Sequence, residues 1–200
     1  MDKVASEVWY QSLTQEEEKL WFEQKIKECQ PKLTKFAYHL TRNSEKAQDL
    51  IQEALLRAFK YRKSYKPQYP FSNWVCTILL NVHRQKCKKE KLMRFFVPWK
   101  EDGEEEEDLW EFIAVEGDNP EEKTIKNQIW KDLGKVIEEL PPKMKEVVVL
   151  CDLLGHSYEE TSEIVGCPLG TVRSRLHRAR KKIKQSVEEK YGSDFLATWG

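Results

Sequence analysis

The chain has 200 residues, and its 34 basic and 34 acidic side chains give a formal net charge of zero. Its mean hydropathy is −0.72, and no window approaches the ~18 consecutive apolar residues of a membrane span, which excludes membrane insertion. The N-terminus lacks the basic-then-apolar pattern of a secretion signal, so we expect a cytoplasmic protein.

The first predicted module covers about residues 20–92, after an N-terminal extension of residues 1–19. Apolar residues between Glu16 and Leu40 predict one or two helices. The next helix carries apolar residues at steps of three and four from Ala47 to Phe59, a pattern typical of an amphipathic helix. Its expected N-cap is Ser44, with Asn43 as the alternative.

The opposite face of this second helix carries Asp49, Gln52 and Glu53. Two interpretations are open: an ordinary solvated face, or an acidic patch that docks a basic partner. Periodicity alone favours the solvated face.

Aromatic and basic residues alternate over residues 60–71, where two prolines make a helix improbable. Tyr65 and Lys66 lie at the centre of this loop. Such a loop suits single-stranded nucleic acid, because lysines follow phosphates while rings stack on bases. The alternative is that the tyrosine rings pack on the core, and this stretch alone does not decide between the two.

Residues 72–91 predict a helix that is apolar early and basic late. Asn81, Arg84 and Lys88 recur at steps of three and four and therefore share one face. This helix can bury one end and lay the other along a phosphate backbone. A block of twelve acids without Lys or Arg follows between Glu101 and Glu122, and residues 93–120 are predicted to form an acidic flexible linker.

The second module covers about residues 121–190, followed by a tail of residues 191–200. Two amphipathic helices are expected between Glu122 and Leu154. Ser157 and Glu160 then form a capping box, a short turn follows at Gly166, and another helix opens near Gly170 with Thr171 as its N-cap. This pattern predicts a helix-turn-helix over about residues 158–177, whose second helix enters the major groove.

The five cysteines are widely spaced and odd in number, without a CxxC pair. Structural metal sites need ligands about two to four residues apart, so we expect reduced thiols, no metal and no cofactor. We also find no paired carboxylates, nucleophile with its base, or phosphate-binding glycine loop, and expect no catalytic residues. The cysteines are Cys29, Cys76, Cys87, Cys151 and Cys167.

Four stretches give the chain a family resemblance. It resembles bacterial sigma factors of the extracytoplasmic-function group of the sigma-70 family through DLIQEALLRAF (49–59), FSNWVCTILLN (71–81), ELPPKMKEVVVL (139–150) and SYEETSEIVGCPLGTVRSRLHRARKKI (157–183). The resemblance implies an all-α fold of two small helical domains, sigma domain 2 and sigma domain 4, joined by the acidic linker.

The resemblance also implies partners and roles. Asp49, Gln52 and Glu53 would dock core RNA polymerase, and the loop with Tyr65 and Lys66 would capture an unpaired base of the −10 element. Asn81 would contribute to the same recognition, while the basic face of its helix alone predicts DNA contacts for Arg84 and Lys88. The −35 duplex would be read from the second helix of the helix-turn-helix by Thr171, Val172, Arg173, Ser174, Arg175, His177 and Arg178.

The sequence departs from the family pattern at two places. Gln85 stands where an acid is common four residues after the equivalent of Asn81, and Thr161-Ser162 replaces an apolar-Ala pair. An anti-sigma factor is a further candidate partner. The alternative function is a stand-alone helix-turn-helix regulator, which would not need polymerase to act.

Overall fold

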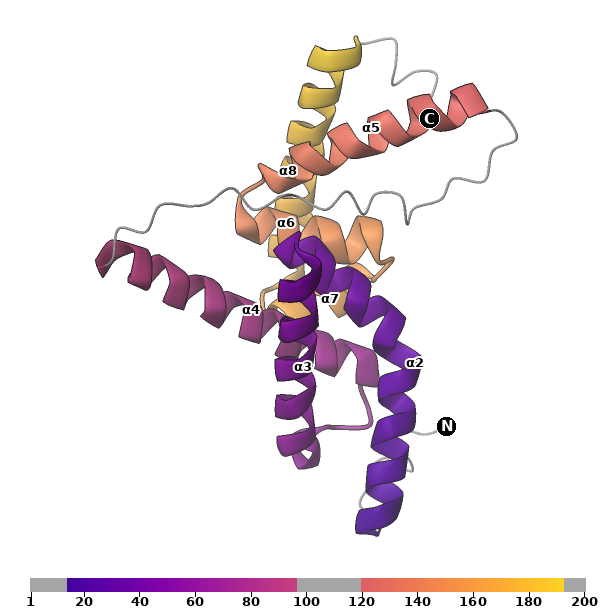
Figure 1. Cartoon of the computed structure of the whole chain (residues 1–200), viewed down its shortest axis with the longest axis vertical. Helices are drawn as coiled ribbons and strands as arrows, with labels where there is room; N and C mark the ends of the chain where they lie inside the picture. Colours follow the sequence, from indigo (N-terminus) through magenta and orange to yellow (C-terminus); the bar gives the residue numbers. More distant parts are fainter. Residues whose placement is uncertain (1–13, 97–119, 193–200) are drawn as a thin grey trace. The chain divides into compact units, whose positions relative to one another are not determined.

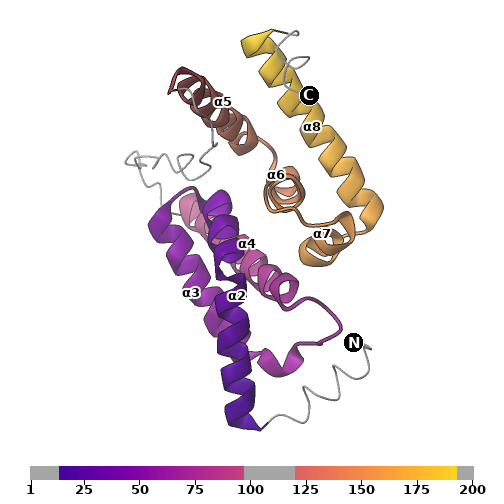
Figure 2. The ribbon, with the colours of Figure 1, turned by 90° about the vertical axis from the view of Figure 1, so that its right-hand side faces the viewer.

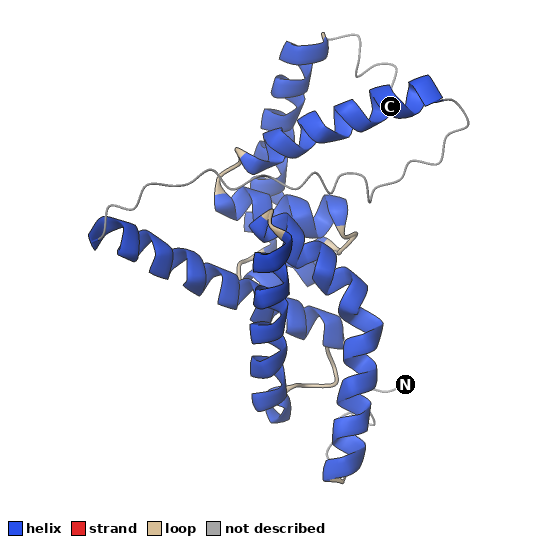
Figure 3. Cartoon of the chain, viewed as in Figure 1, coloured by secondary structure: helices blue, strands red, loops and turns tan. Residues whose placement is uncertain are grey.

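The computed structural model of the chain describes residues 14–96 and 120–192 (Figure 1). Within these residues every regular element is helical and no strand occurs, which confirms the all-α prediction (Figure 3). The chain divides into two compact units, one built by the helices up to α4 and the other mostly by residues from α5 onward. The acidic block and the tail after Gly192 lie outside the described residues.

The first unit consists of three long helices, α2 (Gln15–Thr41), α3 (Ser44–Lys60) and α4 (Phe71–Phe96) (Figure 2). Each helix packs against the other two, and their apolar faces form one core. The largest fully buried side chains of this core are Leu33, Phe36, Leu50, Val75, Leu79, Leu80 and Val82.

Local sequence sets the ends of these helices. Thr14 caps α2 in a capping box with Glu17, and Asn43, the alternative named from sequence, caps α3 by accepting a bond from the Lys46 amide. α2 is a single helix that continues through Pro31. α4 extends to Phe96, so the predicted linker, expected from residue 93, begins inside a helix.

The connection from α3 to α4 is held by aromatic packing. A short 3₁₀ turn, η1 (Arg62–Ser64), leads into Tyr65, whose ring is only 7% exposed. That ring lies 5.3 Å from the Phe71 ring and 5.6 Å from the Trp21 ring. The Tyr65 hydroxyl donates to the Tyr69 carbonyl at 2.8 Å, which fixes the bend of the loop.

The second unit contains α5 (Pro120–Glu138), α6 (Pro142–Val148), η3 (Val149–Leu153) and α8 (Leu169–Tyr191), with α7 (Tyr158–Val165) preceding α8 in the chain. η3 is a π-helical turn that continues α6. α6 packs on α8, and α5 packs on both. None of the described helices has a stretch long and apolar enough to cross a bilayer.

Thr161 accounts for one departure from the family pattern. Its side chain is fully buried, and its hydroxyl lies 3.2 Å from the Cys151 thiol, with which it forms a hydrogen bond. A buried hydroxyl is tolerated where it has a partner, and here the thiol provides one.

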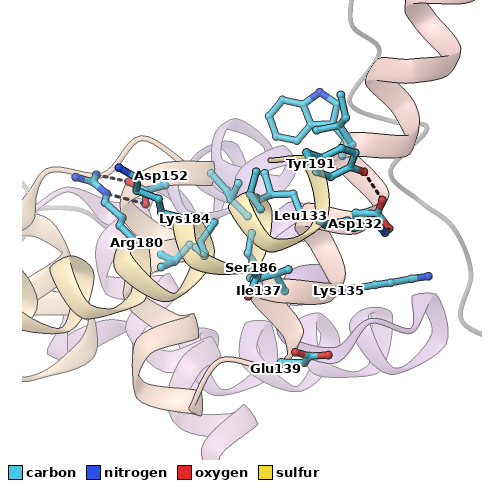
Figure 4. A pocket seen from close by; sticks show the side chains of 18 residues that line it. Asp132, Leu133, Lys135, Ile137, Glu139, Asp152, Arg180, Lys184, Ser186 and Tyr191 are labelled. Carbon is cyan, nitrogen blue, oxygen red and sulfur yellow. Dashed lines mark hydrogen bonds and ion pairs between the residues drawn. The ribbon is translucent and has the colours of Figure 1, made fainter. Parts of the chain in front are cut away.

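A buried carboxylate joins α5 to the end of α8. Asp132 is 6% exposed; it accepts a hydrogen bond from the Tyr191 hydroxyl and lies 2.6 Å from the Lys190 ammonium (Figure 4). These two partners, Lys190 first, lower the pKa of Asp132 to about 2 against the opposing effect of burial. Burial and the bond to Asp132 raise the pKa of Tyr191 to about 12.

This cluster predicts a pH-dependent loss of stability. Because the pKa of Asp132 is lower in the folded chain than in the unfolded one, its contribution is complete above about pH 4 and is lost as the pH falls toward 2. We expect Asp132→Asn to lower the free energy of unfolding by about 1.5–3 kcal/mol at pH 7. The free energies of unfolding of the two proteins, measured with urea, should converge as the pH is lowered from 4 toward 2. Glu189→Gln, an exposed change on α8 beside Lys190, should have no such effect.

Candidate nucleic-acid and polymerase interfaces

The helix-turn-helix begins at a confirmed capping box. The Glu160 amide donates to the Ser157 hydroxyl oxygen at 3.0 Å, and the Ser157 amide donates to the Glu160 carboxylate at 2.9 Å. α7 is followed by Gly166, whose φ of 70° lies in the left-handed region that glycine enters without strain. The chain thereby turns within three residues into the next helix.

The N-cap of α8 lies three residues earlier than the sequence predicted. It is Pro168, so the expectation of Thr171 as the N-cap is wrong. Proline sets φ near the value that a helix start requires, and the hydrophobic Leu169 can therefore occupy the first turn. Thr171 instead lies inside the first turn, where its carbonyl accepts the Ser174 hydroxyl at 3.1 Å.

The start of α8 separates buried from exposed side chains. Val172, Leu176 and Ala179 are at most 2% exposed, whereas Arg173, Ser174, His177 and Arg178 are exposed. Val172, one of the predicted contacts, is therefore part of the core and its side chain cannot reach DNA. The predicted contacts with accessible side chains form one polar and basic face of α8.

Two of the three arginines predicted to contact DNA have local partners. The Arg178 guanidinium donates to the Ser174 carbonyl at 3.1 Å, which lays it back along the helix. Arg175 is half-buried and donates to the Cys167 sulfur at 3.5 Å. Arg173 is exposed and has no such partner among the described residues, so of these three arginines it is the one with the most freedom to reach outward.

The predicted basic face of α4 is also present. Asn81, Arg84 and Lys88 follow one another along a single side of the helix, with Asn81 and Lys88 exposed. Val82, next to Asn81, is fully buried, so the helix presents Asn81 while its other face holds the core. The amide of Asn81 offers both a donor and an acceptor.

The two predicted contact residues of the loop between α3 and α4 differ in exposure. Lys66 is exposed, but the Tyr65 ring is enclosed by Trp21, Phe71 and Trp74. In this conformation Tyr65 offers no free ring face for stacking, and burial raises the pKa of its hydroxyl. Tyr69 is 45% exposed, so of these two tyrosines it carries the accessible ring, which residue order alone could not show.

A hollow of about 530 Å³ lies between this loop and α2 within the first unit. Lys25 and Lys32 line it from α2, and residues Pro67–Ser72 line it from the loop. Sequence reasoning missed the α2 residues, because nothing in the chain order signals that they lie opposite the loop.

The predicted docking residues lie together on α3. Asp49 and Gln52 are exposed, and Glu53 is half-buried in a network that reaches α4. The Glu53 carboxylate lies 2.6 Å from the Arg57 guanidinium and 3.2 Å from the Lys86 ammonium. Burial alone would raise its pKa, but Lys86 and Arg57 together hold the pKa of Glu53 below its ordinary value.

The same network accounts for the second departure from the family pattern. Gln85 accepts a hydrogen bond from the Arg57 guanidinium at 2.7 Å, so its amide takes part in the link between α3 and α4. Asp49 is thus the acidic side chain of this face that remains exposed and outside that network.

The cysteines and other possible metal ligands do not cluster among the described residues. None of the five cysteines forms a disulfide, and no group of three Cys, His, Asp or Glu side chains in the described ranges could hold a metal ion. Burial raises the pKa of Cys29 to about 11 and that of Cys76 to about 12. Thiols with such pKa values are poor nucleophiles at neutral pH.

Comparison with protein families finds two matches, one in each unit. Residues 26–92 match the model of sigma-70 region 2, and residues 130–183 match that of sigma-70 region 4. The chain is 31% identical to the ECF RNA polymerase sigma factor EcfG of Rhodopseudomonas palustris over 172 residues, covering 82% of this chain and 84% of that protein.

Two other similar proteins are also sigma factors. The chain is 31% identical to the ECF sigma factor SigE of Mycolicibacterium smegmatis over 159 residues, which is 80% of this chain and 58% of that protein's length. Its fold is similar to that of the sigma factor RpoE in complex with the anti-sigma factor NepR from Bartonella quintana. That likeness has a TM-score of 0.66 and 24% identity, and it covers 84% of this chain and 96% of the solved one.

Proposed function

This chain belongs to the extracytoplasmic-function group of sigma-70 family RNA polymerase sigma factors, and on that basis we propose that it binds core RNA polymerase and directs it to promoters. The observation that carries the proposal is the presence of sigma-70 regions 2 and 4 in one chain. It acts as a specificity subunit in the cytoplasm, and catalysis with its metal ions belongs to the core enzyme. An anti-sigma factor is a further class of partner.

The second unit recognises the upstream element as duplex DNA. The first turns of α8 enter the major groove, and Arg173 and Arg175 reach base edges or phosphates. Thr171, Ser174, His177 and Arg178 complete this contact surface. Val172 supports it from the core without touching DNA itself.

The first unit engages the downstream element once its strands separate. Unstacking a base costs a few kcal/mol, so a pocket must compensate with stacking and hydrogen bonds. The hollow between α2 and the loop supports such a role, with Tyr69 as the accessible ring and Lys66 beside it. Asn81 bonds the base, while Arg84 and Lys88 hold phosphates. Tyr65 contributes as a stacking partner only if the loop opens.

Asn81→Ala tests whether the first unit binds the downstream element only after its strands separate. We expect it to reduce open-complex formation about tenfold while changing closed-complex binding less than twofold, because the proposed partner of Asn81 exists only after melting. Potassium permanganate footprinting measures melting, and gel shift at low temperature measures closed binding. An equal loss at both stages would place Asn81 in duplex contact instead. Lys89→Ala, an exposed change on the same helix, serves as the control.

Co-purification distinguishes the proposal from a stand-alone regulator. The tagged chain should recover the core subunits from purified core enzyme in stoichiometric amount and bind promoter DNA far better as holoenzyme than alone. If the chain did not bind core enzyme but bound a specific duplex DNA tightly by itself, the proposal would be contradicted and the stand-alone regulator favoured.

A further inference from the structure

The loop between α3 and α4 runs beside α2 and is held there by an ion pair (Figure 2). Glu18, in the first turn of α2, is only 9% exposed, although a carboxylate is costly to bury. Its carboxylate lies 3.3 Å from the Nε atom of Arg62, the first residue of η1. Because buried charges are tolerated where they are paired, this link to the loop accounts for the burial of Glu18.

Arg62 connects the Glu18 carboxylate to the end of α3 and to the start of the loop. Its guanidinium donates to the Phe59 carbonyl at 3.0 Å and lies 4.4 Å from the centre of the Phe59 ring. Its own carbonyl accepts a hydrogen bond from the Tyr65 amide at 3.0 Å. The position of Arg62 therefore sets the direction in which the chain leaves α3.

A second contact from α2 holds the other end of the loop. Trp21 lies one helical turn after Glu18 and therefore on the same side of α2. Its ring centre is 5.3 Å from that of Phe71, at the start of α4, and the ring also packs on Tyr65. Lys25, one further turn along, lines the hollow between α2 and the loop. One side of α2 thus anchors both ends of the loop and forms a wall of the hollow.

The residues between these anchors form the exposed part of the loop. Lys66 and Tyr69 are exposed, and the Tyr69 amide donates to the Lys66 carbonyl at 3.1 Å, so this part of the chain makes a turn between Tyr65 and Phe71. A short turn moves with its ends, so a shift of Arg62 also shifts Tyr69. A loop that already has its binding conformation loses less conformational entropy when a ligand binds.

We propose that Glu18 and Arg62 are positioning residues for the capture of an unpaired base. Their ion pair holds the loop in the conformation in which Tyr69 lines the hollow, and neither side chain contacts DNA itself. The inference rests on the proposed function of the hollow and adds that base capture depends on a contact with α2 outside the hollow. Without the ion pair, the DNA itself has to order the loop, which lowers the affinity.

Binding of single-stranded DNA to the holoenzyme tests the proposal. The probe is a fluorescein-labelled oligonucleotide with the non-template strand of the downstream element from a promoter that the wild-type holoenzyme opens. We expect Glu18→Gln and Arg62→Gln each to weaken its binding about tenfold in fluorescence polarisation. The variant with both changes should bind no more weakly than the weaker single variant, because each change removes the same ion pair.

Two further variants control for the loss of charge. Arg62→Lys should bind the probe within about threefold of wild type, because the lysine ammonium can still pair with Glu18. Glu16→Gln, an exposed change in the same turn of α2, should have no effect on binding.

Two measurements separate positioning from a general effect on stability. The affinity of each variant for core polymerase, which depends on α3 of the same unit, should stay within about twofold of wild type. Hydrogen–deuterium exchange should rise in a peptide that covers residues 62–70 and stay unchanged in α3 and α4. If Arg62→Gln unfolds the chain by circular dichroism, Glu18→Gln carries the test, because glutamine has nearly the shape of glutamate.

Three outcomes would overturn the proposal. Wild-type affinity for the probe in both single variants would show that the loop does not need the ion pair. Losses that add in the double variant would give Glu18 and Arg62 independent roles. A matching loss of affinity for core polymerase would show that the pair only stabilises the first unit. A wild-type holoenzyme that opens no promoter would instead contradict the proposed function itself, so the two failures are distinguishable.

Discussion

Changing Asp49 to Lys and Glu53 to Gln in one chain should lower its affinity for core RNA polymerase roughly a hundredfold, about 3 kcal/mol. The proposed partner surface is basic, so a Lys at the exposed position 49 replaces attraction by repulsion. Gln at position 53 removes the second charge yet can still bond Arg57 and Lys86, so the link between α3 and α4 survives. Fluorescence titration of labelled chain with core enzyme measures the loss.

Glu23→Lys is the matched control for this change. Glu23 is exposed on α2 of the same unit, and its substitution reverses a charge without touching α3. It should leave the affinity for core enzyme within about twofold of wild type. If the Asp49 and Glu53 variant retained wild-type affinity, the acidic face of α3 would be an ordinary solvated surface, the interpretation that periodicity alone favoured.

Arg173→Ala should weaken binding to the upstream promoter element by about 1–3 kcal/mol, roughly 5- to 150-fold, and relax the sequence preference at one position. Its side chain is exposed in the first turns of α8, where a bidentate contact to a guanine edge is geometrically available. Arg175→Ala should give a loss of similar size, because the half-buried guanidinium held at Cys167 is pre-positioned. Holoenzyme titrations on promoter variants measure both.

Lys182→Ala distinguishes base recognition from phosphate contact. Lys182 is exposed on the same helix, more than two turns beyond Arg173. A phosphate contact there should weaken binding to all sequences alike and lower its salt dependence. Arg173→Ala and Arg175→Ala variants that both kept wild-type affinity and specificity would contradict the assignment of α8 as the reading helix.

Helical periodicity was sufficient to predict the elements that build each core. The apolar spacing of α3 and α4 and the capping box at Ser157 led to the helices that the structure contains. These signals depend on residues close together in sequence. The predicted N-cap of α8 was wrong. Thr171 is the better capping residue by type, but the helix starts after Pro168, whose fixed φ already suits a helix start.

The features that sequence could not give depend on contacts between distant residues. Whether Tyr65 or Tyr69 is the accessible ring depends on Trp21 and Phe71, which enclose Tyr65 from other elements. Glu53 is partly neutralised by Lys86, 33 residues further along the chain. Thr161 stands at a position where the family has an apolar residue, and its hydrogen-bond partner Cys151 comes from another element. Each assignment required the packing of one helix on another.

Run-off transcription with purified core RNA polymerase tests the central claim most directly. Adding this chain to core enzyme should produce transcripts from a defined set of promoters, and the Asp49 and Glu53 variant should produce none. The same transcripts should shift or disappear when the upstream element is altered. Core enzyme that starts no specific transcript with this chain, on any promoter to which the chain binds, would contradict the account.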